Sequence, residues 1–362
     1  MNLKELSGIL GLSTTTVSRA LNGYPEVNAE TRARVMAAAR RYDYAPNQVA
    51  RRLATGRTHA IGHVIPLATH QMINPLFADF IAGAGETYSA GGFDMILSVV
   101  QDRDEHEAYR TMISHGKVDG IMVHGPKLDD GRIDLLDELG VPFVVHGRDG
   151  RDEASYSWLD MNNRRAFLRA TEFLLDLGHR RIALVNGLET MHFARRRRIG
   201  YENALAAHNV EIDPDLVRGA DMTESFGFGA ARDMLALVDP PTAFVTSSIM
   251  IALGVQRALG EAGLRSGRDV SIVTHDDDLS FLPNSGPVPM FTATRSSIRQ
   301  AGRRAAEILR ARAEPYARLM TKEMGKTISG GRAEVEKCAW VCDYYAENAE
   351  RFLADEPVQT DA

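Results

Sequence analysis

Three side chains near the amino terminus have the types and spacing that reading DNA bases requires. Thr14, Thr15 and Arg19 lie within one short polar stretch. A threonine offers a hydroxyl and a methyl group to base edges in the major groove, and an arginine can donate two hydrogen bonds to a guanine. This chemistry needs a helix that is held rigidly while its outer face stays free.

The surrounding residues predict two short helices joined by a tight turn. Apolar residues recur at helical spacing before Gly11, and glycine adopts the left-handed conformation that ends a helix at little cost. Ser13 can cap the next helix with its hydroxyl, and Val17 and Ala20 give that helix a buried face. This is the helix-turn-helix pattern. A third helix is predicted to follow, with Asn28 as its cap.

The distribution of charge supports a nucleic-acid partner for this head. The first 58 residues hold nine Lys and Arg against four Asp and Glu, whereas the whole chain of 362 residues has a net charge of −6. A basic head on an acidic body is typical of a small nucleic-acid-binding module.

The amino-terminal motifs resemble those of the LacI family of bacterial transcription regulators. The matching segments are Leu12-Ser13-x-x-Thr16-Val17-Ser18-Arg19-x-Leu21-Asn22-Gly23, Val27-Asn28-x-Glu30-Thr31-Arg32-x-Arg34-Val35, Tyr44-x-Pro46-Asn47-x-Val49-Ala50-Arg51-x-Leu53 and Thr55-Gly56-Arg57. The resemblance implies that Thr14, Thr15 and Arg19 contact bases. It also implies that Ser13, Thr16, Ser18 and Asn22 lie near phosphates. The family often has larger residues at the two threonine positions, which leaves the operator sequence open. The alternative is that these threonines only cover a solvent-exposed face.

Residues 47–54 resemble the hinge helix of that family. The implied DNA contacts are Asn47, Ala50, Arg51 and Leu53. Leu53 matches the leucine that enters the minor groove and kinks the duplex, although it could instead be a plain apolar linker residue. Eight residues are too few for a stable helix in water, so we expect this segment to order only against DNA and a second copy of the chain. Because a homodimer has two-fold symmetry, we expect its double-stranded operator to be near-palindromic.

Composition places the chain among soluble proteins of two or three domains. It is 44% hydrophobic and 25% charged. No run of 18 apolar residues and no signal peptide is present, which predicts no membrane association. Two cysteines imply no disulfide framework. We therefore expect a cytoplasmic protein.

The body alternates short apolar runs with helical patterns, which predicts parallel sheets covered on both faces. The strand candidates are 61–65, 95–100, 120–124, 143–146, 182–186, 243–246 and 270–274, and the helical stretches lie near 76–90, 104–115, 162–177, 196–208, 227–237, 250–263 and 297–309. Two consecutive series predict an α/β core of two doubly wound lobes behind the all-α headpiece. The resemblance implies that this core is similar to periplasmic binding proteins.

We assign domain limits from these patterns. The predicted parts are 1–46 for the helix-turn-helix domain, 47–58 for the hinge and linker, 59–162 with 291–310 for the amino-terminal lobe, 163–290 for the carboxy-terminal lobe, and 311–362 for a helical tail.

Ligand contacts are expected beyond the carboxyl ends of the strands, where such folds bind small molecules. The candidates are Asn74, Phe77, Asp160, Phe193, Arg197, Ser248 and Asp276. An arginine and carboxylates around a cleft suit the hydroxyls of a sugar, and the resemblance implies a small sugar effector. The alternatives are helix capping for Asp160 and Asp276 and plain core packing for Phe77 and Phe193. The arginines that flank Arg197 are interpreted as a solvated face.

The sequence indicates no cofactor, no metal site and no catalytic residue. Asp276, Asp277 and Asp278 with His275 could suggest a metal, but three consecutive acids cannot all reach one ion from an ordinary strand end. The histidines show no zinc spacing. Gly227-Phe228-Gly229 is too short for a nucleotide-binding fingerprint.

Residues 311–362 resemble a different family, the aldehyde dehydrogenases of the succinate-semialdehyde type. The similar segments are 314–326 and 334–340, which match amino-terminal helices of those enzymes. Cys338 and Cys342 are spaced for packing on one helix face rather than for catalysis. The simplest hypothesis is a fusion, natural or artefactual, that replaced the last strand of the regulator. A helical oligomerisation tail is the alternative.

We predict a sequence-specific, ligand-responsive transcriptional regulator, a repressor of carbohydrate-use genes. One rival hypothesis is an aldehyde-oxidising enzyme. Another is a defective fusion that binds DNA without responding to an effector.

Overall fold

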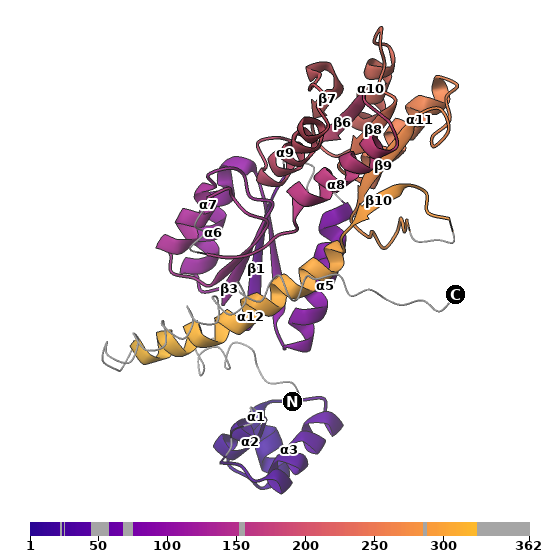
Figure 1. Ribbon diagram of the computed structural model, residues 1–362. Coiled ribbons are helices and arrows are strands. Elements are labelled where there is room, and N and C mark those ends of the chain that lie inside the picture. Colours follow the sequence, from indigo (N-terminus) through magenta and orange to yellow (C-terminus); the bar gives the residue numbers. More distant parts are fainter. Residues whose placement is uncertain are drawn as a thin grey trace. The chain divides into compact units, whose positions relative to one another are not determined.

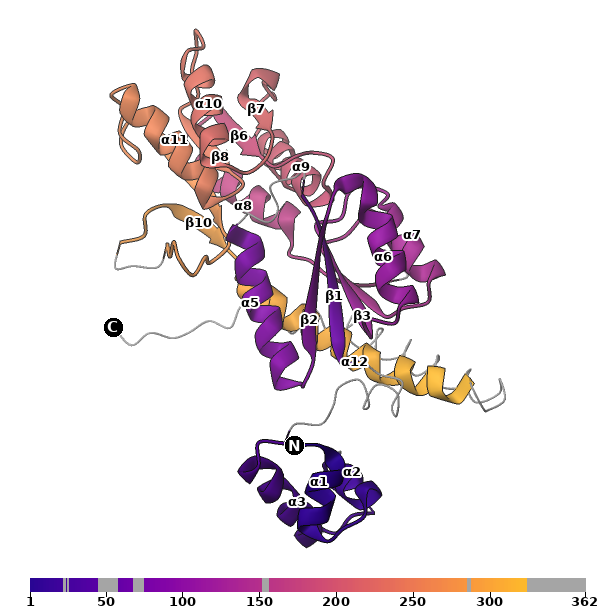
Figure 2. The same ribbon diagram turned by 180° about the vertical axis from the view of Figure 1, so that it is seen from behind.

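The computed structural model describes residues 1–21, 24, 26–44, 58–67, 75–151, 156–284 and 288–323 (Figures 1 and 2). The chain forms separate compact units, a helical one within residues 1–58 and a larger core, His59–Leu319. Several predicted features lie outside the described residues, namely Asn22, the hinge contacts Asn47, Ala50, Arg51 and Leu53, the ligand candidate Asn74, and the tail beyond residue 323.

Local caps define the helices of the amino-terminal unit. These helices are α1 (Leu3–Leu10), α2 (Thr14–Leu21) and α3 (Ala29–Arg41). Gly11 ends α1 with a φ of 65°, in the left-handed region. The Ser13 hydroxyl accepts a hydrogen bond from the backbone N–H of Thr16 at 3.0 Å, and the side chain of Asn28 accepts one from the N–H of Thr31 at 2.7 Å. The predicted turn and both predicted caps are confirmed.

The amino-terminal unit has its own hydrophobic core. The buried side chains are Leu6, Val17, Ala20, Val27, Val35 and Ala39. Because Val17 and Ala20 point into this core, the opposite face of α2 is held outward by packing rather than by contacts of its own polar residues.

The first lobe of the core is a parallel sheet between two helical layers. Its strands are β1 (Ala60–Pro66), β2 (Asp94–Val100), β3 (Gly120–His124), β4 (Phe143–His146) and β5 (Ser157–Leu159), and its helices are α5 (Pro75–Ala90), α6 (Glu105–Ser114) after the short η1 (Asp102–Asp104), α7 (Gly131–Glu138) and α12 (Ile298–Glu323). The strand order is β2-β1-β3-β4-β5. Ile61 and Met122 pack against residues of α5 and α12, whereas Val64 and Val123 pack against residues of α6 and α7. Figure 2 shows α5 and α12 on one side of the sheet and α6 and α7 on the other. This alternation is expected for a sheet that is buried on both faces.

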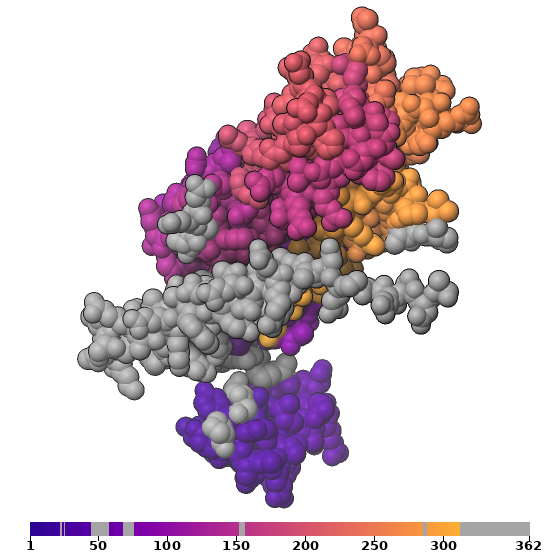
Figure 3. Space-filling view, in the orientation of Figure 1, coloured from indigo at the N-terminus to yellow at the C-terminus, as the bar shows by residue number. Residues whose placement is uncertain are grey.

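The second lobe repeats this plan. Its strands are β6 (Ile182–Asn186), β7 (Val217–Gly219), β8 (Ala243–Thr246), β9 (Ser271–Asp276) and β10 (Thr292–Arg295), and its helices are α8 (Asn163–Asp176), α9 (His192–Ala207), the short η2 (Pro214–Leu216), α10 (Glu224–Leu235) and α11 (Ile249–Glu261). The parallel strands are ordered β10-β9-β8-β6-β7. Leu184 and Val245 pack against α8 and α9, and Ala183 and Phe244 pack against α10 and α11. The surfaces of the two lobes meet in the space-filling view (Figure 3).

A glycine sets the distance between α8 and α9. A Cβ added at Gly200 would lie 2.2 Å from the carbonyl oxygen of Arg164, which is closer than real Cβ atoms approach. The two helices can therefore pack backbone to backbone. Arg197 lies one turn before Gly200 on the same side of α9, so this close packing directs its side chain toward the start of α8.

The predicted fold class is confirmed in the described residues, with some differences in detail. β9 continues to Asp276 instead of ending at residue 274, and α9 begins at His192 rather than near residue 196. β10 pairs with β9 in the second sheet, although residues 291–310 were assigned to the first lobe. α12 runs without a break past residue 311, where the sequence suggested a change of family. In the described ranges no helix combines the length and the hydrophobicity needed to cross a membrane.

Candidate nucleic-acid surface and ligand cleft

The predicted base-reading residues lie together on the outer face of α2. Thr14, Thr15 and Arg19 are exposed, and Ser13 precedes them at the helix start. Among the described residues, no hydrogen bond or ion pair holds the Arg19 side chain. Thr16 and Ser18 are half-buried, and the Thr16 hydroxyl lies 2.8 Å from that of Ser13. The face therefore presents one free guanidinium and two short side chains.

Two other basic residues of this unit have structural partners. The Arg32 guanidinium donates a hydrogen bond to the carbonyl of Tyr24 at 2.7 Å, and Arg34 donates one to the carbonyl of Leu10 at 2.7 Å. The count of basic residues therefore overstates the number of cations that are free to meet phosphates.

In the core, a chain of hydrogen bonds links the segment after β5, the start of α8, helix α9 and the residue that follows β8. The side-chain amide of Asn163 donates to Asp160 at 3.1 Å, and its carbonyl oxygen accepts from Arg197 Nε at 2.8 Å. The Arg197 guanidinium also donates to the backbone carbonyl of Ser247 at 2.7 Å. Asp160 after β5, α9 and the end of β8 are thus held in one network.

Arg197 is buried in the centre of this network. It is 4% exposed, and its guanidinium lies 5.0 Å from the ring centre of Phe167 and 4.9 Å from that of Phe193. Burial lowers the pKa of Arg197 to about 10, and the carboxylates of Asp277 and Asp160 oppose that shift. The group remains a cation at neutral pH and is stacked between two aromatic rings.

The other described ligand candidates have local partners of their own. The rings of Phe77 and His124 form a T-shaped pair with 5.1 Å between their centres. The Ser248 hydroxyl caps α11 by accepting from the N–H of Ile251 at 3.3 Å. Asp276 accepts from the N–H of Asp278 at 2.8 Å. The structure therefore brings Asp160, Phe193 and Arg197 together, whereas Ser248 and Asp276 also have structural roles.

A second group of polar side chains lies around Asp160. Arg148 Nε lies 3.5 Å from the second carboxylate oxygen of Asp160, and the Arg148 guanidinium stacks 4.6 Å from the ring centre of Trp158. Burial raises the pKa of Asp160, while the charges of Arg148 and Arg196 oppose that shift. His192 also lies near this carboxylate, and burial lowers its pKa. Two arginines, Arg148 and Arg196, therefore lie close to the carboxylate of Asp160.

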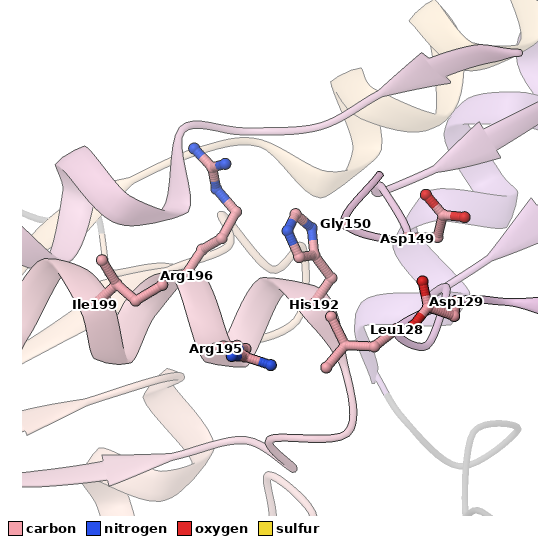
Figure 4. Close-up of a pocket in the computed structure, with 8 residues that line it drawn as sticks. All are labelled: Leu128, Asp129, Asp149, Gly150, His192, Arg195, Arg196 and Ile199. Carbon is pink, nitrogen blue, oxygen red and sulfur yellow. The ribbon is translucent and has the colours of Figure 1, made fainter. Parts of the chain in front are cut away.

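An open cavity of about 310 Å³ adjoins this cluster. Its lining residues come from the loops after β3 and β4 and from α9, and they are Leu128, Asp129, Asp149, Gly150, His192, Arg195, Arg196 and Ile199 (Figure 4). The cavity is therefore bounded by both lobes of the core.

Several residues of this region are not among those that the sequence predicts. Arg196 was interpreted as part of a solvated run, yet it is half-buried and its Nε atom is enclosed. Asp277 lies near Arg197 and His146, because β9 extends further than predicted. Asn163 follows Asp160 by three residues at the start of α8, so the sequence predicts that the two residues are close. The sequence does not predict the hydrogen bond between Asn163 and Arg197.

Comparison with family models matches three parts of the chain. Residues 2–47 match the model of bacterial regulatory proteins of the lacI family, and residues 171–326 match a periplasmic binding protein-like domain. Residues 291–362 match the aldehyde dehydrogenase family, so the last two matches overlap.

Curated relatives cover most of the chain. The HTH-type transcriptional regulator AglR of Rhizobium meliloti is 44% identical over 85% of this chain and 87% of its own length. RafR of Escherichia coli, another HTH-type transcriptional regulator, is 35% identical over 76% of this chain and 82% of its own. CelR of Thermobifida fusca, also an HTH-type transcriptional regulator, is 32% identical over 85% of this chain and 90% of its own length. These relatives are transcriptional regulators, not enzymes.

Solved structures have the same fold. A complex of the transcriptional regulator CelR with cellobiose matches with a TM-score of 0.64 and 30% identity, covering 87% of this chain and 94% of that one. The Lac repressor bound to ONPG in the repressed state matches with a TM-score of 0.72 and 25% identity, covering 87% and 94%.

Proposed function

This chain belongs to the LacI family of bacterial regulatory proteins and is a DNA-binding transcriptional regulator, and we propose that it represses genes of carbohydrate use under the control of a small sugar. The observation that carries the proposal is the buried network of Asp160, Asn163 and Arg197 in the cleft of a chain that also presents Arg19 on a rigid helix. The similarity to a regulator solved with cellobiose supports a sugar as the effector.

For DNA recognition, we propose that α2 enters the major groove of a near-palindromic operator. Thr14, Thr15 and Arg19 would contact base edges. The phosphate and minor-groove contacts would come from Ser13, Thr16, Ser18, Asn22, Asn47, Ala50, Arg51 and Leu53. A homodimer would place one head on each half-site.

For the effector, we propose that the sugar occupies the cleft beside Arg197. Asp160 and Arg197 would bind hydroxyls, and Phe193 would cover an apolar face of the ring. Asn74, Phe77, Ser248 and Asp276 complete the proposed lining. A carboxylate and a guanidinium fixed by other hydrogen bonds need little reorganisation when the sugar arrives.

Control would follow from differential binding. The operator would favour one arrangement of the two lobes, together with ordered hinge helices. The sugar would favour another arrangement, in which the two heads separate. Each ligand then weakens the other by the same factor, because the coupling free energy is reciprocal.

We propose that the chain acts in the cytoplasm, where its DNA lies, and that residues 311–362 are a fused fragment of an aldehyde dehydrogenase. The match of residues 291–362 to the aldehyde dehydrogenase family supports the fusion. We expect no oxidation of succinic semialdehyde, and a nicotinamide reduction assay tests this.

Operator selection tests the DNA-binding half of the proposal. The full chain is incubated with a random duplex library, and bound DNA is recovered and sequenced over several rounds. We expect a near-palindromic site with a guanine in each half that depends on Arg19. Recovery of unrelated sequences, with equal affinity for random DNA, would contradict sequence-specific recognition.

A further inference from the structure

We propose that the cavity between α9 and the loops after β3 and β4 binds a second sugar ring, so that the effector is a neutral oligosaccharide of at least two rings. This inference rests on the proposed sugar response and names the class of sugar.

The cavity lies beside the proposed effector residues but is lined by different ones. None of Phe77, Asp160, Phe193, Arg197, Ser248 and Asp276 lines it. Its wall residues His192 and Arg196 lie close enough to Asp160 for their charges to act on one another. The loop after β4, which forms one wall of the cavity, also carries Arg148, whose Nε lies 3.5 Å from Asp160, so a sugar held at Asp160 would have the cavity beside it. Its volume of about 310 Å³ lies at the low end of the range for small-molecule sites, which suits one ring rather than a whole oligosaccharide.

Enclosed polar atoms without hydrogen bonds point to a ligand at this place. Among the described residues, no hydrogen bond reaches the enclosed atoms His192 Nδ1, Arg196 Nε, Arg148 Nε or the second carboxylate oxygen of Asp160. The last two atoms face one another at 3.5 Å. Arg148 and Asp160 therefore form an ion pair, whereas His192 and Arg196 line the cavity, and a sugar hydroxyl that met either of them after a small side-chain shift would supply a missing partner.

The mixture of charges in the wall favours a neutral sugar over an anionic one. Arg195 and Arg196 offer donors, whereas Asp129 offers acceptors and would repel a carboxylate or phosphate. A hydroxyl can serve both, because it donates and accepts. Leu128 and Ile199 add the apolar surface on which the C–H groups of a sugar ring can pack.

Asp149 fixes the conformation of the cavity wall, because its carboxylate is already paired and is not available to a ligand. Its carboxylate pairs with Arg151 Nε at 2.7 Å and accepts a hydrogen bond from the Tyr156 hydroxyl at 2.8 Å. The loop after β4 is thereby fixed. At its tip Gly150 has a φ of 98°, and an added Cβ there would lie 3.2 Å from the His192 ring.

The second ring would contact both lobes. The wall joins the loop after β3 to α9, and these segments already meet where the N–H of Leu128 donates to the carbonyl of Thr190 at 3.1 Å. A ring held between Asp129 on one lobe and Arg196 on the other would stabilise this arrangement of the lobes. The regulator would then respond to the disaccharide more strongly than to either of its component sugars.

Calorimetric titration of the full chain tests the inference. The probes are cellobiose, maltose and melibiose, the monosaccharides glucose and galactose, and glucuronate as the anion. We expect at least one disaccharide to bind about tenfold or more tightly than its monosaccharides, and glucuronate to bind no better than glucose.

Two variants locate the second ring. Ile199→Trp should fill the cavity and lower disaccharide affinity by about tenfold or more, while monosaccharide affinity stays within about twofold. Ile212→Trp is the matched control, because Ile212 is similarly exposed (41% against 37%) and lies outside the cavity. Asp129→Asn keeps a residue that tolerates the φ of 50° at this position and should lower disaccharide affinity alone, by about threefold.

The outcomes separate this inference from the function on which it rests. If monosaccharides bind as tightly as disaccharides and Ile199→Trp changes neither, the second ring is excluded while the sugar response stands. Tighter binding of glucuronate than of glucose would overturn the proposal that the effector is a neutral sugar. If none of the sugars binds, the proposed sugar response falls, and the second ring falls with it.

Discussion

The polar side chains on the outer face of α2 are exposed, whereas those around Arg197 in the core are buried. On α2, Thr14, Thr15 and Arg19 are exposed, and the helix is held by the apolar residues behind them. In the cleft, Arg197 and Asn163 are buried and held by each other. The first region makes its contacts only when a partner arrives, whereas the second has made most of them in advance.

This difference separates the residues that stabilise the fold from those that give specificity. Substitutions on α2 should change DNA binding and leave folding almost intact. Substitutions in the cleft should change both folding and the response to the ligand, because the same bonds serve both.

Arg197→Ala should lower the free energy of unfolding by about 3–5 kcal/mol, because it leaves Asn163 and the Ser247 carbonyl without their donor and removes the cation beside buried carboxylates. Urea unfolding followed by circular dichroism measures this. Arg195→Ala, on the exposed side of the same helix, should stay within about 0.5 kcal/mol of the parent. Equal losses for the two variants would mean that the cleft network does not support the fold.

Acid should destabilise the core and spare the amino-terminal unit. His63 and His124 are buried, with His63 Nδ1 and His124 Nε2 2.8 Å apart, and burial lowers the pKa of His63 to about 3 and holds that of His124 well below its usual value. Both stay neutral in the folded chain, whereas an unfolded histidine takes up a proton below about pH 6.5. Stability should therefore be constant above that pH and fall as the pH drops, by about 2 kcal/mol per histidine at pH 5.

Thermal melting between pH 7.5 and 5 checks this prediction. Residues 1–58 contain no histidine, so their helical signal should not share the acid sensitivity. His63→Gln should reduce the pH dependence of the core by the contribution of one proton. A melting temperature of the core that does not change across this range would show that these histidines are protonated in the folded state.

Arg19→Ala should cost about 1–3 kcal/mol of discrimination between the operator and a site with one changed guanine. Its melting temperature should match that of the parent, because no hydrogen bond or ion pair among the described residues holds this side chain. Fluorescence anisotropy on the two duplexes measures the discrimination. Arg40→Ala, an exposed arginine on α3, is the control and should weaken both duplexes alike. The same uniform loss for Arg19→Ala would assign Arg19 to phosphate rather than to base contact.

Thr15→Ala should have the smallest effect, about 0.5–1 kcal/mol in operator affinity, because it removes one hydroxyl and keeps a Cβ for apolar contact. Anisotropy on the selected operator measures it. A loss as large as that of Arg19→Ala would indicate that Thr15 is the main base contact of α2.

The sequence predicted the elements with strong periodicity and the turn with explicit cap residues. The strands 120–124, 143–146, 182–186 and 243–246 were placed to the residue, because buried parallel strands read as short apolar runs. β5 and β7 were missed since three residues are too few to show a period. Gly11 and Ser13 marked the turn between α1 and α2 unambiguously.

The cleft was only partly predictable, for a physical reason that the arginine run shows. α9 starts at His192 without a side-chain cap, so no residue type marked its beginning. Without that start, the angular position of each arginine was unknown. In the structure Arg195 is exposed at the cavity, Arg196 is half-buried in the cavity wall, Arg197 is buried, and Arg198 pairs with Glu189 and Glu202. Four identical neighbours take four roles that depend only on the helix phase.

The most direct measurement of the central claim is the affinity of the full chain for its selected operator with and without sugar. Fluorescence anisotropy would be recorded at fixed salt, because phosphate contacts make DNA affinity strongly salt-dependent. We predict tight binding without sugar and at least about tenfold weaker binding with one of the disaccharides, and this shift should be lost in Arg197→Ala. Operator affinity that no sugar of the panel changes, in a chain that calorimetry shows to bind one of them, would contradict a sugar-controlled repressor.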